Sequence, residues 1–291
     1  MNYSTTGEQG YLDLIRDILD NGVDRDDRTG TGTRSVFGRQ LRFDLSEGFP
    51  LLTTKKMELK SVLSELIWFI EGSGDERRLA EIRYGKPRDK LNGKTTIWTA
   101  NAEADYWATK AAFEGDLGRV YGVQWRAWTN RKGEQTDQIA NLVRGLQEDP
   151  NSRRHILLGW NPGELDEMAL PPCHVMSNFY VVDGKLSCMM TQRSQDVLLG
   201  APYNYASYAL LTHMLAQVCG YGVGELIVSS ADTHLYLNHL DQAREQIART
   251  PRELPQLIVK PDVTSIELFT MADFKLEGYD PHPAIKAPMA V

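Results

Sequence analysis

Cys173 is the residue best placed for nucleophilic chemistry. It follows two prolines in Pro171-Pro172-Cys173-His174, and a cysteine on such a stiff, exposed turn can act as a nucleophile when nearby positive charge lowers its pKa. An isolated cysteine is more often a buried structural thiol, so the motif alone leaves both interpretations open. Cys188 and Cys219 lie in apolar strand and helix contexts, and for them we favour the structural interpretation.

Several arginines are candidates for an anion site. They stand in three places: Arg28 in the small-residue loop 27–33, Arg153 and Arg154 at the start of a predicted strand, and Arg193 followed by Ser194 after another. Guanidinium groups and a hydroxyl are what a phosphate monoester needs. Each arginine taken singly is more often a solvated surface charge.

Four further polar residues lie beside apolar stretches, namely Asp196, Asn204, His234 and Tyr236. The amide of Asn204 can donate and accept at once, as recognition of a pyrimidine edge requires. His234 and Tyr236 fall on one face of an extended segment, because side chains alternate along a strand. The alternative is that all four are satisfied polar residues of the core.

The first half of the chain predicts the elements that position these groups. Apolar spacing indicates a helix over Tyr11–Asn21 that ends at Gly22, a strand over Ser35–Phe43, and a largely buried helix over Leu59–Glu71 that carries Glu65. Residues 75–94 are charged and contain Gly-Lys-Pro, which indicates a surface insertion.

The second half favours strands. We expect strands over His155–Trp160, Val175–Val182 and Lys185–Gln192, the last two joined by the hairpin signal Asp183-Gly184, and a long helix over Ala206–Cys219. This mixed order predicts an α+β fold in one domain over residues 1–291, with a mixed β-sheet packed against helices.

Composition excludes several classes of protein. The 291 residues carry a net charge of −7, so we expect no nucleic-acid partner. No apolar run is long enough to span a membrane, and the N-terminus lacks a signal-peptide pattern. Three sparse cysteines argue for a reducing compartment, and no zinc-ligand spacing is present. We therefore expect a cytoplasmic protein without a metal, in the host cytoplasm if its source is viral.

The chain resembles the thymidylate synthase family over nearly its whole length. The similarity rests on several independent motifs in the family's order: 27–33, Pro171-Pro172-Cys173-His174, Gln192-Arg193-Ser194-Gln195-Asp196-Val197, Pro202-Tyr203-Asn204-Tyr205-Ala206-Ser207-Tyr208, Asp232-Thr233-His234-Leu235-Tyr236 and Gly278-Tyr279-Asp280-Pro281-His282-Pro283. It implies the family's fold, with a sheet face forming a homodimer interface.

The resemblance also implies a role for each site residue. Cys173 would add to carbon 6 of dUMP, Glu65 would manage proton transfers, and Asn204 would read the base. Tyr121, His174, Arg193 and Asp196 would complete the catalytic network. The nucleotide would be bound by Arg28, Gln192, Arg193, Ser194, His234 and Tyr236, with Arg153 and Arg154 reaching the phosphate from the partner subunit.

The cosubstrate implied by the resemblance is 5,10-methylenetetrahydrofolate. Thiolate addition would turn carbon 5 of uracil into a nucleophile able to attack its one-carbon group, and burial would raise the pKa of Glu65 towards neutrality. The folate pocket would be lined by Lys55, Trp98, Leu170, Asp196, Leu199, Gly200, Tyr203 and the tail through Val291.

The sequence departs from the family where the product is decided. The run Trp-Asp-Glu-Trp reads Trp98-Thr99-Ala100-Asn101, paired glycines read Ser230-Ala231, and Phe-Asn-Ile reads Tyr203-Asn204-Tyr205. A usual Gln is replaced by Asn178, next to Ser177, and a usual Tyr by Thr191. Smaller or more polar groups there could admit a water that captures the exocyclic methylene before hydride does.

We therefore expect a dUMP hydroxymethylase, of the kind that supplies modified bases to DNA of some bacteriophages. Trp98 and the complete tail also suit an ordinary thymidylate synthase, which is the alternative. Two weaker alternatives are a nucleotide- or RNA-binding homologue without turnover, and a cytidine nucleotide as substrate. Related dCMP hydroxymethylases carry Asp where this chain has Asn204, which favours uracil.

Overall fold

A twisted six-stranded sheet is the centre of the molecule. The computed structural model describes residues 4–289. The sheet has the order β1-β2-β8-β7-β6-β5, and all neighbours are antiparallel except β7 and β8. Its strands are β1 (Val23–Arg25), β2 (Thr33–Asp44), β5 (Ile156–Leu158), β6 (His174–Val182), β7 (Lys185–Asp196) and β8 (Gly222–Tyr236). This mixed sheet confirms the predicted α+β class.

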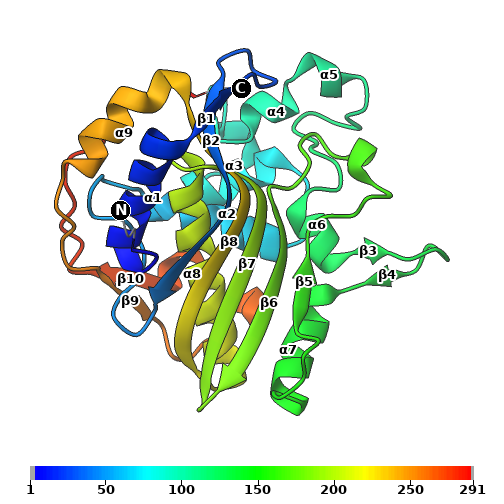
Figure 1. Ribbon diagram of the computed structural model, residues 1–291. Coiled ribbons are helices and arrows are strands. Elements are labelled where there is room, and N and C mark those ends of the chain that lie inside the picture. Colours follow the sequence, from blue (N-terminus) through cyan, green and yellow to red (C-terminus); the bar gives the residue numbers. More distant parts are fainter. Residues whose placement is uncertain (1–3, 290–291) are drawn as a thin grey trace.

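Helices pack against one face of the sheet. Figure 1 shows α8 behind β6, β7 and β8, with no described helix in front of them. The helices are α1 (Gly7–Asn21), α2 (Leu59–Ile70), α3 (Glu76–Tyr84), α4 (Thr99–Ala102), α5 (Asp105–Ala108), α6 (Tyr121–Arg126), α7 (Gln138–Glu148), α8 (Gly200–Cys219) and α9 (Leu240–Ile247). Two small sheets pair β3 (Trp128–Thr129) with β4 (Gln135–Thr136), and β9 (Gln256–Val259) with β10 (Phe274–Glu277).

The hairpin between β6 and β7 forms as its turn residues predict. Asp183 and Gly184 have φ of 49° and 70°, the left-handed pair that a two-residue turn of type I′ requires. Val182 pairs with Lys185, so the register is set at the turn. This register brings the start of β6, after Cys173, alongside the end of β7, which carries Arg193.

Helices α2 and α8 form the floor beneath the site. Leu210, Leu211, Met214 and Leu215 of α8 are fully buried, which explains why this helix is apolar around most of its surface. The chain leaves α8 through Gly220, whose φ of 77° is left-handed. The N-terminal end of α8 carries Asn204, whose side chain reaches Gln192 of β7.

The structure extends or corrects several predicted elements. Strand β8 was predicted only at its end, although Leu226, Val228 and Ser230 alternate into the core. Helices α7 and α9 were not predicted. The segment 75–94 contains α3, which packs on α2 and buries Leu79 and Ala80, whereas residues 85–90 are exposed. Its charged composition hid the short apolar stripe of α3.

Candidate active site

Arg193 and Cys173 meet where β7 ends and β6 begins. The guanidinium of Arg193 donates through Nε to the carbonyl of Pro172 and through Nη2 to that of Pro171, both at 2.8 Å. Its Nη2 then lies 3.9 Å from the Cys173 sulfur. The backbone N–H of Cys173 donates to the Tyr121 hydroxyl at 2.7 Å. The two prolines therefore supply the carbonyl groups that aim the arginine at the thiol.

The pKa of the Cys173 thiol is set by opposing effects. Burial raises its pKa most, the Arg193 guanidinium lowers it, and the Asp196 carboxylate raises it further, so the pKa lies above its ordinary value. Arg193 acts in the expected direction but does not outweigh burial. The resting group is a thiol, and Arg193 is the group that favours its ionisation.

His174 is held neutral beneath this loop. Its ring stacks on Tyr121 with centroids 4.1 Å apart, and Nδ1 is hydrogen-bonded to the Tyr208 hydroxyl at 2.7 Å. Burial lowers the pKa of His174 to about 3. An imidazole that stays uncharged at neutral pH orders the Tyr208 hydroxyl and supports the Tyr121 ring without adding positive charge beside Cys173.

The depressed pKa of His174 predicts a pH-dependent stability. Below about pH 6.5 the unfolded chain protonates this histidine and the folded chain does not, so unfolding becomes easier by about 1.4 kcal/mol per pH unit. The effect grows as the pH falls towards 3 and is absent above 6.5. Urea denaturation at pH 6.5 and 5 should show a steeper loss of stability for the native sequence than for His174→Asn. Equal slopes would contradict the assignment.

Glu65 lies behind Trp98. The indole Nε1 of Trp98 donates to Glu65 Oε1 at 2.7 Å, and the Trp98 ring contacts Tyr121 edge-on at 5.8 Å. Burial raises the pKa of Glu65, against smaller lowering effects of the Trp98 hydrogen bond and the Arg83 charge. A carboxyl whose pKa is raised by burial beside aromatic side chains can exchange protons closer to neutral pH than an exposed glutamate can.

Asn204, the fifth residue of α8, projects towards β7. Its Oδ1 accepts a hydrogen bond from Gln192 Nε2 at 2.9 Å, and Gln192 Oε1 accepts from Gln195 Nε2 at 2.7 Å. Both glutamines are almost fully buried. The amide predicted to read a base is thus itself fixed by a chain of amides.

Asp196 and Lys55 lie where β7 passes into α8. The Asp196 Oδ1 accepts from the backbone N–H groups of Leu198 at 3.1 Å and Leu199 at 3.2 Å. Lys55 donates to the Leu198 carbonyl, and burial lowers its pKa to about 8 against the opposing Asp196 charge. Both side chains face the region between β7 and the start of α8.

The ends of β8 and the 27–33 loop adjoin this site. His234 Nδ1 is 2.8 Å from Asp232 Oδ1, and its ring contacts Tyr236 with centroids 5.4 Å apart. Burial raises the pKa of Tyr236, the carboxylates of Asp196 and Asp27 raise it further, and the Arg28 guanidinium lowers it. Strand pairing sets Ser194 beside Asp232. Arg28 is exposed and therefore open to an anion.

Arg153 and Arg154 lie far from Cys173 in the same chain. Strand pairing sets Leu158 opposite Met176 and Ile156 opposite Asn178, which aligns residue 154 with residue 180. Cys173 is therefore seven positions away along β6 (180 − 173), or roughly 23 Å at the usual rise per residue. The structure does not bring these arginines to the site of their own chain.

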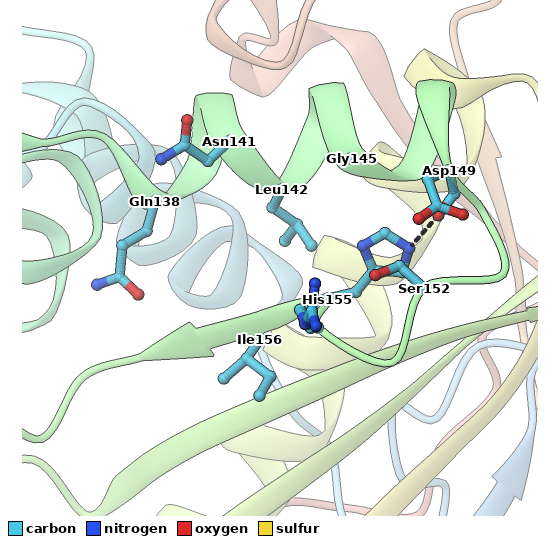
Figure 2. Close-up of a pocket in the computed structure, with 9 residues that line it drawn as sticks. Gln138, Asn141, Leu142, Gly145, Asp149, Ser152, His155 and Ile156 are labelled. Carbon is cyan, nitrogen blue, oxygen red and sulfur yellow. Dashed lines mark hydrogen bonds between the residues drawn. The ribbon is translucent and has the colours of Figure 1, made fainter.

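A depression of about 300 Å³ lies instead beside Arg154. It is bounded by α7 and the start of β5, and Figure 2 shows His155 hydrogen-bonded to Asp149 at one end of it. Its lining contains none of the residues around Cys173: it consists of Gln138, Asn141, Leu142, Gly145, Asp149, Ser152, Arg154, His155 and Ile156. Cys173, Glu65 and Asn204, where we expect the chemistry, lie outside this depression.

The model of the family described as thymidylate synthase matches residues 9–291. The chain belongs to the thymidylate synthase family. This family transfers a one-carbon unit to dUMP with methylenetetrahydrofolate as cosubstrate, and its members are typically homodimers. The protein is accordingly a folate-dependent transferase of nucleotide biosynthesis.

Residues 4–289 contain no group of three or more His, Cys, Asp or Glu side chains arranged to hold a metal ion. Within the same residues, no helix has both the length and the apolar character needed to cross a membrane.

The residues that the family resemblance assigns to folate come from several segments of the chain. Leu170 precedes the proline pair, whereas Leu199 is the N-cap of α8 and Gly200 and Tyr203 lie in its first turn. Burial raises the pKa of Tyr203, whose hydroxyl is near Glu58. Val291 lies outside the described residues, which end at Met289.

The departures from the family pattern occupy different places. Asn178 and Thr191 alternate with buried Phe179 and Gln192, so they point to the uncovered sheet face, away from Asn204. The expectation that these two would admit water stays a prediction, because Thr191 shares its face of β7 with Arg193, which contacts Cys173.

Two other departures have hydrogen-bond partners: Thr99 donates to Glu76 at 2.6 Å, and Ser230 donates to the Arg39 carbonyl. The ring of Tyr205 is fully buried against Tyr11 and Phe43, and its hydroxyl has no hydrogen-bond partner within residues 4–289. Asn101 is partly exposed and lies next to Trp98 at the start of α4, with no side-chain hydrogen bond within residues 4–289.

Sequence reasoning missed four residues of the site. Trp160 lies under the Arg193 guanidinium at 5.3 Å, Tyr208 bonds His174, Asp232 orients His234, and Gln195 holds Gln192. Tyr208, Asp232 and Gln195 fall inside motifs already recognised, whereas Trp160 carries no motif and is found only through its contact.

Proposed function

We propose that the protein is a deoxyuridylate hydroxymethylase that converts dUMP and 5,10-methylenetetrahydrofolate into 5-hydroxymethyl-dUMP. One domain, residues 1–291, would carry the whole reaction. The observation that supports water capture is the replacement of an aromatic residue by Asn101. In the family pattern this position carries an aromatic residue that faces the folate. Asn101 lies next to Trp98, whose indole is hydrogen-bonded to Glu65.

The residues around Cys173 suit the first half of this reaction. The Cys173 sulfur would add to carbon 6 of uracil, and the electron pair would move to oxygen 4, leaving carbon 5 able to attack the one-carbon group. Asn204 would donate to the developing oxyanion. Glu65, with its raised pKa, would relay the proton lost from carbon 5. Loss of tetrahydrofolate then leaves an exocyclic methylene on carbon 5.

The second half decides the product. In our proposal water adds to the methylene carbon, its proton passes to solvent through Glu65, and expulsion of the Cys173 sulfur restores the pyrimidine double bond. No hydride is consumed, so the folate leaves as tetrahydrofolate. Asn101 is smaller than an aromatic residue and polar, and it would leave room for water where a ring would exclude it.

The polar and aromatic residues of the site fit a folate. Asp196 offers a carboxylate oxygen towards a pterin, Lys55 is buried beside it, and Trp98 and Tyr203 provide aromatic surface for stacking. A folate held there would supply the one-carbon group, which is carried on two nitrogen atoms of the folate.

Partner arginines would complete the phosphate site. Arg153 and Arg154 are exposed and remote from their own Cys173, which suits a role across a homodimer. The uncovered sheet face carries exposed apolar side chains, Ile156 and Tyr180 among them, and these would be buried between two subunits. Arg28, Gln192, Arg193, Ser194, His234 and Tyr236 would bind the rest of the nucleotide.

The alternative is thymidylate synthase, favoured by one observation. Trp98 is retained and its indole is bonded to Glu65, which would shield the methylene from water. Hydride transfer would then give dTMP and dihydrofolate.

Replacement of Asn101 separates the two functions. We expect the native protein to form nucleotide product without the absorbance change of dihydrofolate, and Asn101→Trp to shift product towards dTMP with dihydrofolate by about tenfold, as a change in one contact can. Glu103→Trp, at an exposed position outside the altered run 98–101, is the matched control and should leave the ratio unchanged. Stoichiometric dihydrofolate from the native protein would refute hydroxymethylation.

A further inference from the structure

The three side-chain amides behind the base-reading position form one directed chain. Gln195 Nε2 donates to Gln192 Oε1 at 2.7 Å, and Gln192 Nε2 donates to Asn204 Oδ1 at 2.9 Å. Gln195 and Gln192 are 2% and 1% exposed, so water cannot readily substitute for either partner. Every donor in the chain points towards Asn204.

The chain ends in an unpartnered oxygen. Gln195 Oε1 is buried and has no hydrogen-bond partner within the described residues. Reversing all three amides would keep two hydrogen bonds but would bury the Nε2 group of Gln195, with two donors, in place of one acceptor. Because unsatisfied N–H groups are rarer in proteins than under-satisfied carbonyls, the observed direction is the favoured one.

The donor-to-acceptor direction of the amide chain determines which Asn204 atoms are free to hydrogen-bond a base. With Oδ1 held by Gln192, the Nδ2 group of Asn204 is left without a partner within residues 4–289. A uracil presents an N3–H donor beside an oxygen acceptor, while cytosine presents an acceptor beside an amino donor. A single amide matches one base in one orientation and the other base when flipped.

We infer that Gln195 is a positioning residue that selects uracil over cytosine by holding the Asn204 amide, through Gln192, in one orientation. The inference rests on the proposed role of Asn204 in reading the base. Gln195 itself does not touch the nucleotide. Its effect is indirect. The Nε2 group of Gln195 donates to Gln192 Oε1, and this hydrogen bond keeps the Gln192 amide from flipping its oxygen towards Asn204.

The test compares Gln195→Met with the native protein. Methionine keeps the length and buried character of the side chain but has no amide. Release of tritium from carbon 5 of labelled dUMP and dCMP gives kcat/KM for each base, whichever product later forms. We expect the preference for dUMP to fall about tenfold, the usual effect of misplacing one buried hydrogen-bonding group, and Gln192→Met to add little in the double variant.

A matched control is available at the other end of α8. Gln217 donates to the carbonyls of Lys260 and Val263, both at 2.9 Å, remote from Asn204. Gln217→Met should lower stability without changing the preference between bases. Partial unfolding of a variant lowers kcat/KM for dUMP and for dCMP by the same factor, so it leaves the preference between them unchanged. A folded Gln195→Met protein with the native preference would therefore overturn the inference. Absence of tritium release from native protein would overturn the proposed function itself.

Gln195→Glu provides a second arm if the methionine variant does not fold. A protonated carboxyl can still donate to Gln192 Oε1, whereas an ionised one can only accept, which turns Gln192 and then Asn204 around. The preference for dUMP should therefore fall as pH rises from about 6 to 8, relative to native protein at each pH. A ratio to native that does not change with pH would contradict the relay.

Discussion

Cys173→Ala should yield a folded protein that binds dUMP and makes no product. The thiol supplies the covalent bond that activates carbon 5, so its removal should lower kcat by a factor of about 10⁴ or more. Binding should persist, because the phosphate, sugar and base contacts come from other residues. Tritium release from carbon 5 measures the turnover, and calorimetric titration with dUMP measures the binding.

Cys219→Ala is the matched control for this variant. Cys219 is partly buried at the end of α8, and its sulfur lies 3.8 Å from the Val143 carbonyl, away from the site. The same change of residue type should there leave turnover intact. Turnover above background in Cys173→Ala would remove Cys173 from its role, whereas loss in both variants would indicate a defect of folding.

Glu65→Gln should produce the second largest loss. Glutamine preserves the shape of the side chain and can still accept from the Trp98 indole, but it cannot take up or release a proton. We expect kcat to fall by about 10²–10⁴, the usual range for general acid–base catalysis. Steady-state rates with dUMP and methylenetetrahydrofolate provide the measurement.

The pH profile identifies the cause of that loss. Burial raises the pKa of Glu65, so the native enzyme should lose activity on acidification at a pH above the ordinary range of a glutamate, where the carboxyl becomes protonated. In Glu65→Gln this acidic limb of the pH–rate profile, the loss of activity as the pH falls, should be absent. Glu71→Gln, an exposed change at the end of α2 that affects only the ion pair with Arg78, should retain both the rate and the limb. Retention of the limb in Glu65→Gln would assign it to another group.

Local patterns were sufficient for much of the fold. The Asp183-Gly184 turn, the apolar runs of α2 and α8, and the end of α1 at Gly22 each depend on neighbours in sequence, and the structure has them there. Strand β8 was underestimated because its serines and glycines weaken the alternation. Helix α3 was missed because charged residues outnumber Leu79 and Ala80.

The sequence predicted which residues form the candidate site better than it predicted the contacts between them. Spacing and resemblance named Cys173, Arg193 and Asn204, but the aim of Arg193 depends on the Pro171 and Pro172 carbonyls across two strands. The net upward shift of the Cys173 pKa follows from burial, which sequence does not measure. Likewise, the amide chain through Gln195 exists only because β7 and α8 meet, and the opposite-facing Asn178 and Thr191 became clear only from strand register.

The most direct test of the proposed function is the reaction of dUMP with methylenetetrahydrofolate in water labelled with oxygen-18. If water captures the methylene, mass spectrometry of the nucleotide should show 5-hydroxymethyl-dUMP carrying one labelled oxygen, with no dihydrofolate formed. A product with the mass of dTMP, free of label and accompanied by an equal amount of dihydrofolate, would show hydride transfer and contradict the account.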